Sequence, residues 1–209
     1  MIYGYKDISI DVYLSSNNFR VYVDIKYQKK QEESTNVEKT LREYFGSSMT
    51  TNLKQYRSWL KYDSLQNFTP PGRLVTSYEA AIASVPSQFN LYNVHLSEMN
   101  EEFESTLQNM LPFYISLATR IEAKYDWYYF LLYHHDTSTN SHNLAGYVTC
   151  TEYKSKDQSK HFALISQILI LPLYQRQGHS SKITSTIFNY YLKKTNSRRN
   201  PSRKTSTSL

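Results

Sequence analysis

The fold is decided by one stretch of the chain, Leu164-Ile165-Ser166-Gln167-Ile168-Leu169-Ile170-Leu171-Pro172-Leu173-Tyr174-Gln175-Arg176-Gln177-Gly178-His179-Ser180-Ser181-Lys182-Ile183. Its apolar run, residues 164–171, is short, rich in branched side chains and closed by Pro172, so we predict a buried central strand. Beyond the polar loop, apolar residues recur at spacings of four and three, which predicts a helix that ends near Leu192. The apolar face of that helix consists of Ile183, Ile187, Tyr190 and Tyr191.

A strand that leads through a glycine-containing loop into a helix can hold an anion. The first amide groups of a helix have no acceptor within it, and the helix dipole adds partial positive charge at the same point. A phosphate group placed there would receive several backbone hydrogen bonds. The same pattern also fits an ordinary turn between a strand and a helix, and the shape alone does not separate the two.

The loop around Gly178 resembles a known cofactor motif. The segment Gln175-Arg176-Gln177-Gly178-His179-Ser180 matches Gln/Arg-x-x-Gly-x-Gly/Ala at all but the last position. That pattern is the acetyl-CoA pyrophosphate loop of the general N-acetyltransferase superfamily. Residues 165–175, together with Gly178-His179, closely resemble the type B histone acetyltransferases. The same resemblance extends to residues 3–7, 22–27, 37–39, 127–131 and 146–149.

The resemblance implies an α+β fold in three parts. Residues 1–96 would form an amino-terminal mixed α/β domain that helps to hold a histone tail. Residues 97–192 would form an incomplete N-acetyltransferase fold, with a central mixed sheet flanked by helices, and residues 193–209 a disordered basic tail. On sequence pattern alone, the amino-terminal half is better interpreted as a packing module.

Hydrophobic periodicity predicts the elements of the first half. Apolar residues alternate in residues 8–12 and 21–25 on either side of a polar turn, which predicts a β-hairpin. Thr35-x-x-Glu38 has the form of a capping box for a helix that runs to about Phe45. A second helix is predicted over residues 53–65, with Leu53, Tyr56, Trp59 and Leu60 facing inward, and a strand over residues 89–96.

The second half begins with the longest predicted helix. An apolar stripe runs through residues 101–123, but Pro112 lies inside it and predicts a kink or a break. Strands are then predicted over residues 127–133 and 144–153, separated by a polar hairpin. This order of helix, two strands, strand and helix is that of the acetyltransferases which the chain resembles.

Composition narrows the classes of function. The formal charge of +6 comes from six cations among the last 17 residues, because the first 192 residues hold 18 basic and 18 acidic side chains. A neutral body gives no support for a nucleic-acid groove, so we expect no direct nucleic-acid partner. Cys150 is the only cysteine, which excludes an intrachain disulfide and is typical of a reducing compartment. With no long apolar run or leader, we expect no membrane association.

The resemblance assigns roles to individual residues. Acetyl-CoA would be the co-substrate, with its acetyl and pantetheine portion beside the backbone of Ile168, Leu169 and Ile170. A backbone amide there would stabilise the oxyanion of the reaction. The pyrophosphate would lie on Gln175, Arg176, Gln177, Gly178, His179, Ser180 and Ser181. Ser180 stands where the family has glycine, so we expect weaker cofactor binding.

The histone side of the site is also assigned by resemblance. Trp127, Glu152 and Tyr153 align with residues near the histone substrate, although each also fits a structural role. The expected partners are free core histones, chiefly the histone-four tail, and a β-propeller histone chaperone. The expected location is the nucleus and cytoplasm, and the basic tail fits either a nuclear import signal or disorder. The six histidines have no metal-ligand spacing, so we expect solvated histidines and no metal.

The catalytic base has no counterpart in this sequence. The family glutamate lies in a Glu-Asp-Pro motif beyond the matching region, and residues 193–209 contain no carboxylate. A second family glutamate aligns with Ser116, and Glu122 would point elsewhere on the predicted helix. A free lysine is almost fully protonated at neutral pH, and loss of a positioned base costs about 100-fold to 10,000-fold in rate. We therefore expect weak or no activity and a member truncated at both ends.

Three functions stay open. The first is histone lysine acetylation of type B, from acetyl-CoA to newly made histones. The second is a non-catalytic histone-binding relative that keeps the cofactor fold. The third is acetylation of small amines, which the amino-terminal half disfavours because such enzymes seldom carry an additional domain.

Overall fold

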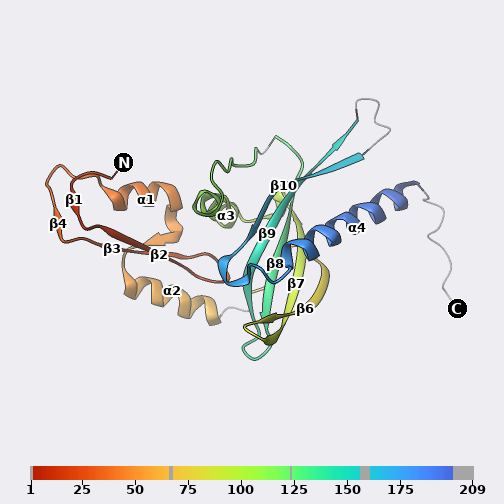
Figure 1. Cartoon of the computed structure of the whole chain (residues 1–209), viewed down its shortest axis with the longest axis horizontal. Helices are drawn as coiled ribbons and strands as arrows, with labels where there is room; N and C mark the ends of the chain where they lie inside the picture. Colours follow the sequence, from red (N-terminus) through yellow and green to blue (C-terminus); the bar gives the residue numbers. More distant parts are fainter. Residues whose placement is uncertain (1, 66–67, 123, 156–160, 200–209) are drawn as a thin grey trace. The chain divides into compact units, whose positions relative to one another are not determined.

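The computed structural model describes residues 2–65, 68–122, 124–155 and 161–199, and its elements are drawn in Figure 1. They form two compact units. The first unit comprises Met1–Pro70, Met99–Ile121 and Ser141–Asn143, and the second comprises Pro71–Glu98, Glu122–Asn140 and Leu144–Leu209. Both units combine helices with sheets, so the predicted α+β class is confirmed. The boundaries predicted from the sequence, at residues 96 and 192, stay a prediction.

The first unit contains the predicted hairpin. Strand β2 (Ser9–Leu14) pairs antiparallel with β3 (Val21–Lys26), and β3 pairs in parallel with the short β5 (Met49–Thr50). A separate two-stranded ladder joins β1 (Tyr5–Lys6) and β4 (Lys29–Lys30). The small core under the hairpin consists of buried Val21, Val23, Phe45 and Met49.

Two predicted details of the first helices are wrong. Helix α1 (Val37–Phe45) is capped by Asn36, whose side chain accepts from the amide of Lys39, so Thr35 is not the cap. Glu38 instead pairs with Arg42 one turn later, at 2.9 Å. Helix α2 (Leu53–Leu65) has the predicted bounds, but only part of its predicted inward face is covered. Tyr56 is buried, whereas Leu53 and Leu60 are exposed.

Helix α3 is shorter than predicted. It runs over Glu101–Tyr114, begins at the Asn100 cap and ends two residues after Pro112. Because proline removes one helical hydrogen bond and clashes with the preceding turn, the predicted break is confirmed, without a second helix in residues 115–122. Residue 123, at the end of the predicted helix, lies outside the described residues.

The second unit is built on a five-stranded sheet in the order β10-β9-β8-β7-β6. These strands are β6 (Arg73–Ile82), β7 (Val85–His95), β8 (Trp127–Asp136), β9 (Ser141–Lys154) and β10 (His161–Ile170). The pairs β6–β7, β7–β8 and β9–β10 are antiparallel. The sequence pattern predicted β8 and β9 closely but missed β6 entirely.

The prediction of a buried central strand at residues 164–171 is wrong. Strand β10 lies at one end of the described sheet, and Leu164 and Ile168 are exposed while Leu169 is buried. A register shift between Ile165 and Gln167 interrupts the alternation of side chains along the strand. A continuous run of apolar residues does not show whether both faces of a strand are buried or only one, so it could not reveal that β10 lies at the edge of the sheet.

Helix α4 covers one face of this sheet. It runs over His179–Arg199 and follows a short 3₁₀ turn, η3 (Pro172–Tyr174). Ile183 and Ile187 are buried against Phe89, Phe130 and Val148, and this cluster is the core of the second unit. The helix continues past the predicted end at Leu192, so residues 193–199 are helical where a disordered tail was predicted. Residues 200–209 lie outside the described residues.

Two further short 3₁₀ turns, η1 (Gly46–Ser48) and η2 (Leu96–Glu98), follow α1 and β7 respectively. In the described part of the chain, no helix is both long enough and apolar enough to cross a membrane.

Candidate functional site

The glycine-containing loop between β10 and α4 has an unusual backbone. Arg176 has φ +61° and Gly178 has φ +80°, so two residues of the loop adopt the left-handed conformation. A Cβ placed on Gly178 would have no heavy atom within 4 Å, which shows that the backbone lies beside open space. Left-handed residues within a turn can direct successive backbone amides toward one point.

The amide groups of this loop are only partly used within the chain. In the described residues, the backbone amide of Tyr174 donates to the carbonyl oxygen of Leu171, and that of Gln175 donates to the carbonyl oxygen of Pro172. The backbone amide of Lys182 donates to the carbonyl oxygen of Gly178. The Gly178 carbonyl is thus the first acceptor of α4, and the amides of residues 179–181 occupy the first turn, where a helix supplies no acceptor. Gly178 has no side chain to cap them, so the helix end presents donors and positive potential together.

Two glutamines of the loop hold its shape. The side-chain Nε2 of Gln175 donates to the carbonyl oxygen of Ile170 at 2.8 Å, and the side-chain Nε2 of Gln177 donates to the carbonyl oxygen of Leu173 at 3.0 Å. Both side chains therefore serve the loop itself. The side chains of Arg176, Ser180 and Ser181 are exposed.

His179 is buried, so the expectation of a solvated histidine is wrong for this residue. Its side chain is 2% exposed and lies against the ring of Phe89, with ring centroids 4.3 Å apart. Its Nδ1 is 2.8 Å from the hydroxyl oxygen of Tyr78. Burial lowers the pKa of His179, which favours the neutral imidazole.

The last residues of β10 are paired with strand β9. Ile168, Leu169 and Ile170 pair with Val148, Tyr147 and Gly146 of β9. Because β10 has a described neighbour on one side only, its other edge has backbone groups directed away from the sheet.

The expected histone-side residues lie at the end of the same sheet. Trp127 is buried and donates its indole N–H to the carbonyl oxygen of Glu122 at 2.8 Å. Glu152 donates its backbone amide to the carbonyl oxygen of Asp126, which brings these residues together. Tyr153 is exposed and stacks on Phe162, with ring centroids 5.1 Å apart.

The carboxylates near Trp127 already have partners. Glu152 forms an ion pair with Lys194 of α4, and Glu122 forms one with Lys124. Glu122 is not helical, so the prediction that placed it on a helical face was wrong, and Ser116 lies in the turn after α3. Within the residues that the structure describes, no group of three or more metal-binding side chains is present.

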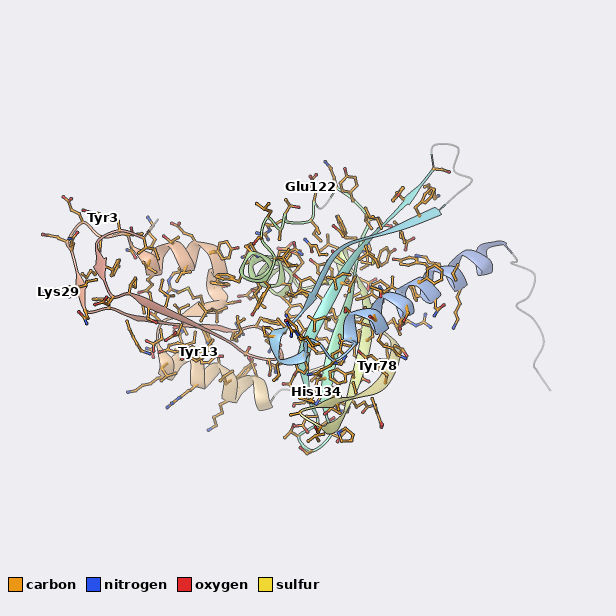
Figure 2. The ribbon with its side chains drawn as sticks, viewed as in Figure 1. Tyr3, Tyr13, Lys29, Tyr78, Glu122 and His134 are labelled. Atoms are coloured by element: carbon orange, nitrogen blue, oxygen red, sulfur yellow. The ribbon has the colours of Figure 1, made fainter. Side chains whose placement is uncertain are left out.

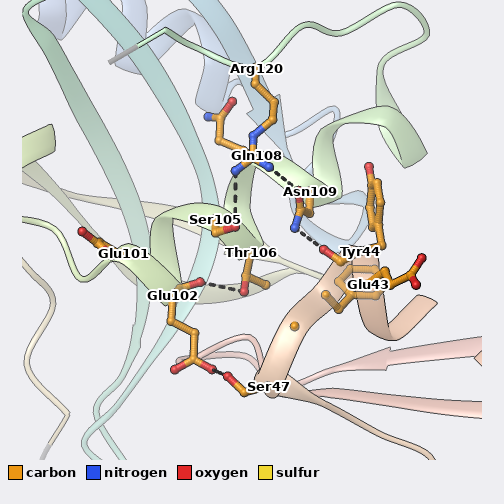
Figure 3. Close-up of a pocket in the computed structure, with 12 residues that line it drawn as sticks. Glu43, Tyr44, Ser47, Glu101, Glu102, Ser105, Thr106, Gln108, Asn109 and Arg120 are labelled. Atoms are coloured by element: carbon orange, nitrogen blue, oxygen red, sulfur yellow. Dashed lines mark hydrogen bonds between the residues drawn. The ribbon is translucent and has the colours of Figure 1, made fainter. Parts of the chain in front are cut away.

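A separate pocket of about 590 Å³ lies in the first unit, between the end of α1 and the start of α3 (Figure 3). Three carboxylates line it, those of Glu43, Glu101 and Glu102. The hydroxyls of Ser47 and Ser48 hold the pKa of Glu102 below its usual value. Across the pocket, Arg120 donates to Asn109 and Ser105. The sequence contained no motif that pointed to this pocket.

Comparison with known proteins identifies the family of the chain. The family described as "Histone acetyl transferase HAT1 N-terminus" matches residues 1–116. Three similar proteins are each named "Histone acetyltransferase type B catalytic subunit": those of Candida albicans (29% identity), Mus musculus (28%) and Homo sapiens (26%). The match covers 91%, 91% and 90% of this chain, and 49%, 48% and 47% of those proteins.

The chain therefore spans about half the length of the curated relatives that it matches. The family match covers more than half of the chain itself, and it includes the hairpin, helices α1, α2 and α3, and strands β6 and β7. The resemblance seen in the sequence is confirmed: this chain belongs to the HAT1 amino-terminal family of histone acetyltransferases.

Proposed function

We propose that the chain binds acetyl-CoA and is part of a type B histone lysine acetyltransferase. The observation that carries this proposal is the loop at residues 175–181, whose first helical amides meet open space at Gly178. A pyrophosphate at this point would accept from the amides of residues 179–181 and gain from the helix dipole. Arg176, exposed beside them, would add a charge-assisted contact.

The pantetheine arm would extend along the open edge of β10. An extended ligand can pair with an exposed strand edge through main-chain hydrogen bonds, and the backbone of Ile168, Leu169 and Ile170 supplies such an edge. In the reaction, a neutral lysine amine attacks the thioester carbonyl carbon and the C–N bond forms. The C–S bond then breaks, and the departing thiolate takes up the proton that the amine nitrogen loses. An amide of β10 directed at the carbonyl oxygen would stabilise the oxyanion.

The proposed substrate is the tail of a free histone, of the histone-four class. Such a tail is basic, and the first unit has a pocket lined by three carboxylates. A lysine or arginine side chain in this pocket would find an ionised Glu102. The β-propeller chaperone partner and a location in the nucleus and cytoplasm are parts of the same proposal.

A second candidate is a non-catalytic histone-binding protein that retains acetyl-CoA. It is favoured by the ion pairs of Glu122 with Lys124 and of Glu152 with Lys194, because these two carboxylates near Trp127 already have partners. Neither carboxylate is held ready to accept a proton from a lysine substrate. For the polypeptide of these 209 residues, we expect coenzyme binding with weak or no turnover.

The test combines titration calorimetry with acetyl-CoA and radiolabelled acetyl transfer to a histone-four tail peptide. Binding with transfer supports the enzyme, and binding without transfer supports the second candidate. Desulfo-coenzyme A should compete for the site, whereas free acetate should not, because the proposed affinity resides in the pyrophosphate and pantetheine. If a folded sample does not bind acetyl-CoA at a saturating concentration, both candidate functions are wrong.

A further inference from the structure

We infer that Tyr78 is a positioning residue for the loop of residues 173–181, acting through His179 and Gln177. The inference rests on the proposed function only for the identity of the ligand, because the contacts themselves lie within the chain. Tyr78 is on β6, 101 positions from His179 in the sequence, and no motif connects the two.

Three hydrogen bonds join β6 to the loop in one chain. The Tyr78 hydroxyl lies 2.8 Å from Nδ1 of His179, and Nε2 of His179 lies 3.2 Å from Oε1 of Gln177. The side-chain nitrogen of Gln177 then donates to the carbonyl oxygen of Leu173 at 3.0 Å. Leu173 and Gln177 lie just before the amides that the proposed pyrophosphate would use, and His179 carries the first of them.

For a neutral imidazole, only one proton arrangement satisfies all three contacts. Oε1 of Gln177 can only accept, so the facing Nε2 of His179 must carry a hydrogen. A neutral imidazole with a proton on Nε2 has an acceptor at Nδ1, and the Tyr78 hydroxyl donates to it. Burial lowers the pKa of His179 and raises that of Tyr78, so both groups stay neutral as this arrangement needs.

This series of hydrogen bonds begins at a row of packed rings on the sheet. Tyr78 is directly opposite Phe89 on β7, and Phe89 is directly opposite His134 on β8, so the three side chains form one row across the sheet. Figure 2 shows Tyr78 and His134 at the same end of it. The Tyr78 and Phe89 rings stack at 5.7 Å, and His179 lies on Phe89 at 4.3 Å.

This attachment explains how the loop keeps its conformation before a ligand arrives. Arg176 and Gly178 hold positive φ, a conformation that an isolated loop would seldom keep at a non-glycine residue. Two side-chain bonds, from Gln175 to Ile170 and from Gln177 to Leu173, oppose its relaxation. The imidazole fixes the rotamer of Gln177, so loss of the Tyr78 hydroxyl should loosen the loop at Gln177 and beyond.

The test uses Tyr78→Phe, which keeps the ring and removes only the hydroxyl. The matched control is Tyr190→Phe, because Tyr190 also donates from its hydroxyl to a side chain of this unit, Asn93, at 3.4 Å. In the unliganded wild type, ¹⁵N NMR of the imidazole should show the tautomer with hydrogen on Nε2. Tyr78→Phe should shift the Nδ1 resonance and speed amide hydrogen exchange at residues 177–181, whereas Tyr190→Phe should change neither.

The second measurement is the acetyl-CoA dissociation constant. We expect Tyr78→Phe to raise it about fivefold to tenfold, the equivalent of one hydrogen bond, and Tyr190→Phe to leave it unchanged. In the double variant Tyr78→Phe with Gln177→Leu, the effect on loop exchange should be smaller than the sum of the two single effects, because both act through one chain.

The positioning role of Tyr78 and the proposed acetyl-CoA binding can be contradicted independently of each other. If loop exchange and the imidazole resonances of Tyr78→Phe equal those of the wild type, the positioning role is wrong whatever the coenzyme does. The same holds if Tyr78→Phe lowers thermal stability but leaves the loop amides unaffected. If the loop responds as expected but the wild type does not bind acetyl-CoA, the positioning role stands and the proposed ligand is wrong.

Discussion

The carbonyl oxygen of Leu169 occupies the space that a side chain on Gly146 would need. A Cβ built on Gly146 would lie 2.4 Å from that oxygen and 3.0 Å from the Cα of Ile170. Both are backbone atoms of β10, so no rotation of a side chain can relieve the contact. The close approach of β9 to β10 at the proposed coenzyme edge therefore depends on glycine at position 146.

Gly146→Ala should destabilise the chain by about 1–3 kcal/mol, because the added methyl group forces the two strands apart. It should also weaken acetyl-CoA binding, since β10 carries the proposed pantetheine edge. Urea unfolding and calorimetry measure the two effects. Thr151→Ala, on the same strand where a Cβ already exists, is the control, and equal stability of the two variants would contradict the argument.

Gly178→Ala tests the loop by backbone conformation. Its φ of +80° is strained for alanine, although the space around it is open, so we expect a loss of about 1 kcal/mol and weaker coenzyme binding. Gly46→Ala is the matched control, because Gly46 also has positive φ and open space but lies in the first unit. Both variants should lose stability, and only Gly178→Ala should lose affinity. Equal affinities would contradict a phosphate site at Gly178.

Lys194→Met should be more destabilising than Lys193→Met on the same helix. The Lys194 ammonium is paired with Glu152 and lies over the rings of Tyr128 and Tyr191, at 5.0 Å and 5.6 Å. Its removal leaves a Glu152 carboxylate that is 14% exposed without its cation. We expect the free energy of unfolding, measured in urea, to fall by about 1–3 kcal/mol, after allowance for partial screening of the ion pair by solvent. In a Glu152→Gln background the loss should shrink, and an unchanged loss would show that the ion pair is not its cause.

The Cys150 thiol should resist alkylation while the chain is folded. Cys150 is fully buried on β9, and burial raises the pKa of its thiol to about 12. Because the thiolate is the reacting form, labelling should proceed only through opening of the second unit. The rate with iodoacetamide, followed by mass spectrometry, should rise steeply across the urea transition. Fast labelling in native buffer would show that the core around Ile183 and Ile187 is open.

Stability should fall as the pH is lowered below about 6.5. Burial lowers the pKa of His179 in the folded chain, so the unfolded chain takes up a proton first. The contribution is complete above the ordinary histidine pKa and is lost as the pH falls toward the lowered value. His134, whose pKa burial also lowers, adds to the same slope. Urea unfolding between about pH 7.5 and pH 5.5 measures it, and His179→Gln should flatten the slope. An unaltered slope would mean that His179 is solvated.

The local elements and the loop could be predicted because they depend on neighbours in sequence. Alternation predicted β8 and β9, Pro112 predicted the end of α3, and the spacing around Gly178 pointed to the turn that opens α4. The predicted end of α4 was wrong because Lys194, interpreted as part of a tail that begins at Lys193, is bound by Glu152 of β9. A helix that gains a tertiary contact continues beyond the end of its apolar stripe.

The sequence by itself determined the family, the α+β class and the position of the loop that we propose binds the coenzyme, since each depends on residue types at short and regular spacing. The tertiary structure alone decided which strand lies at the sheet edge, that His179 turns inward, and that Tyr78 holds it. The physical reason is that β6 and the start of α4 are distant in the chain, and only the pairing of β6 with β7 brings the Tyr78 hydroxyl within hydrogen-bond distance of the imidazole.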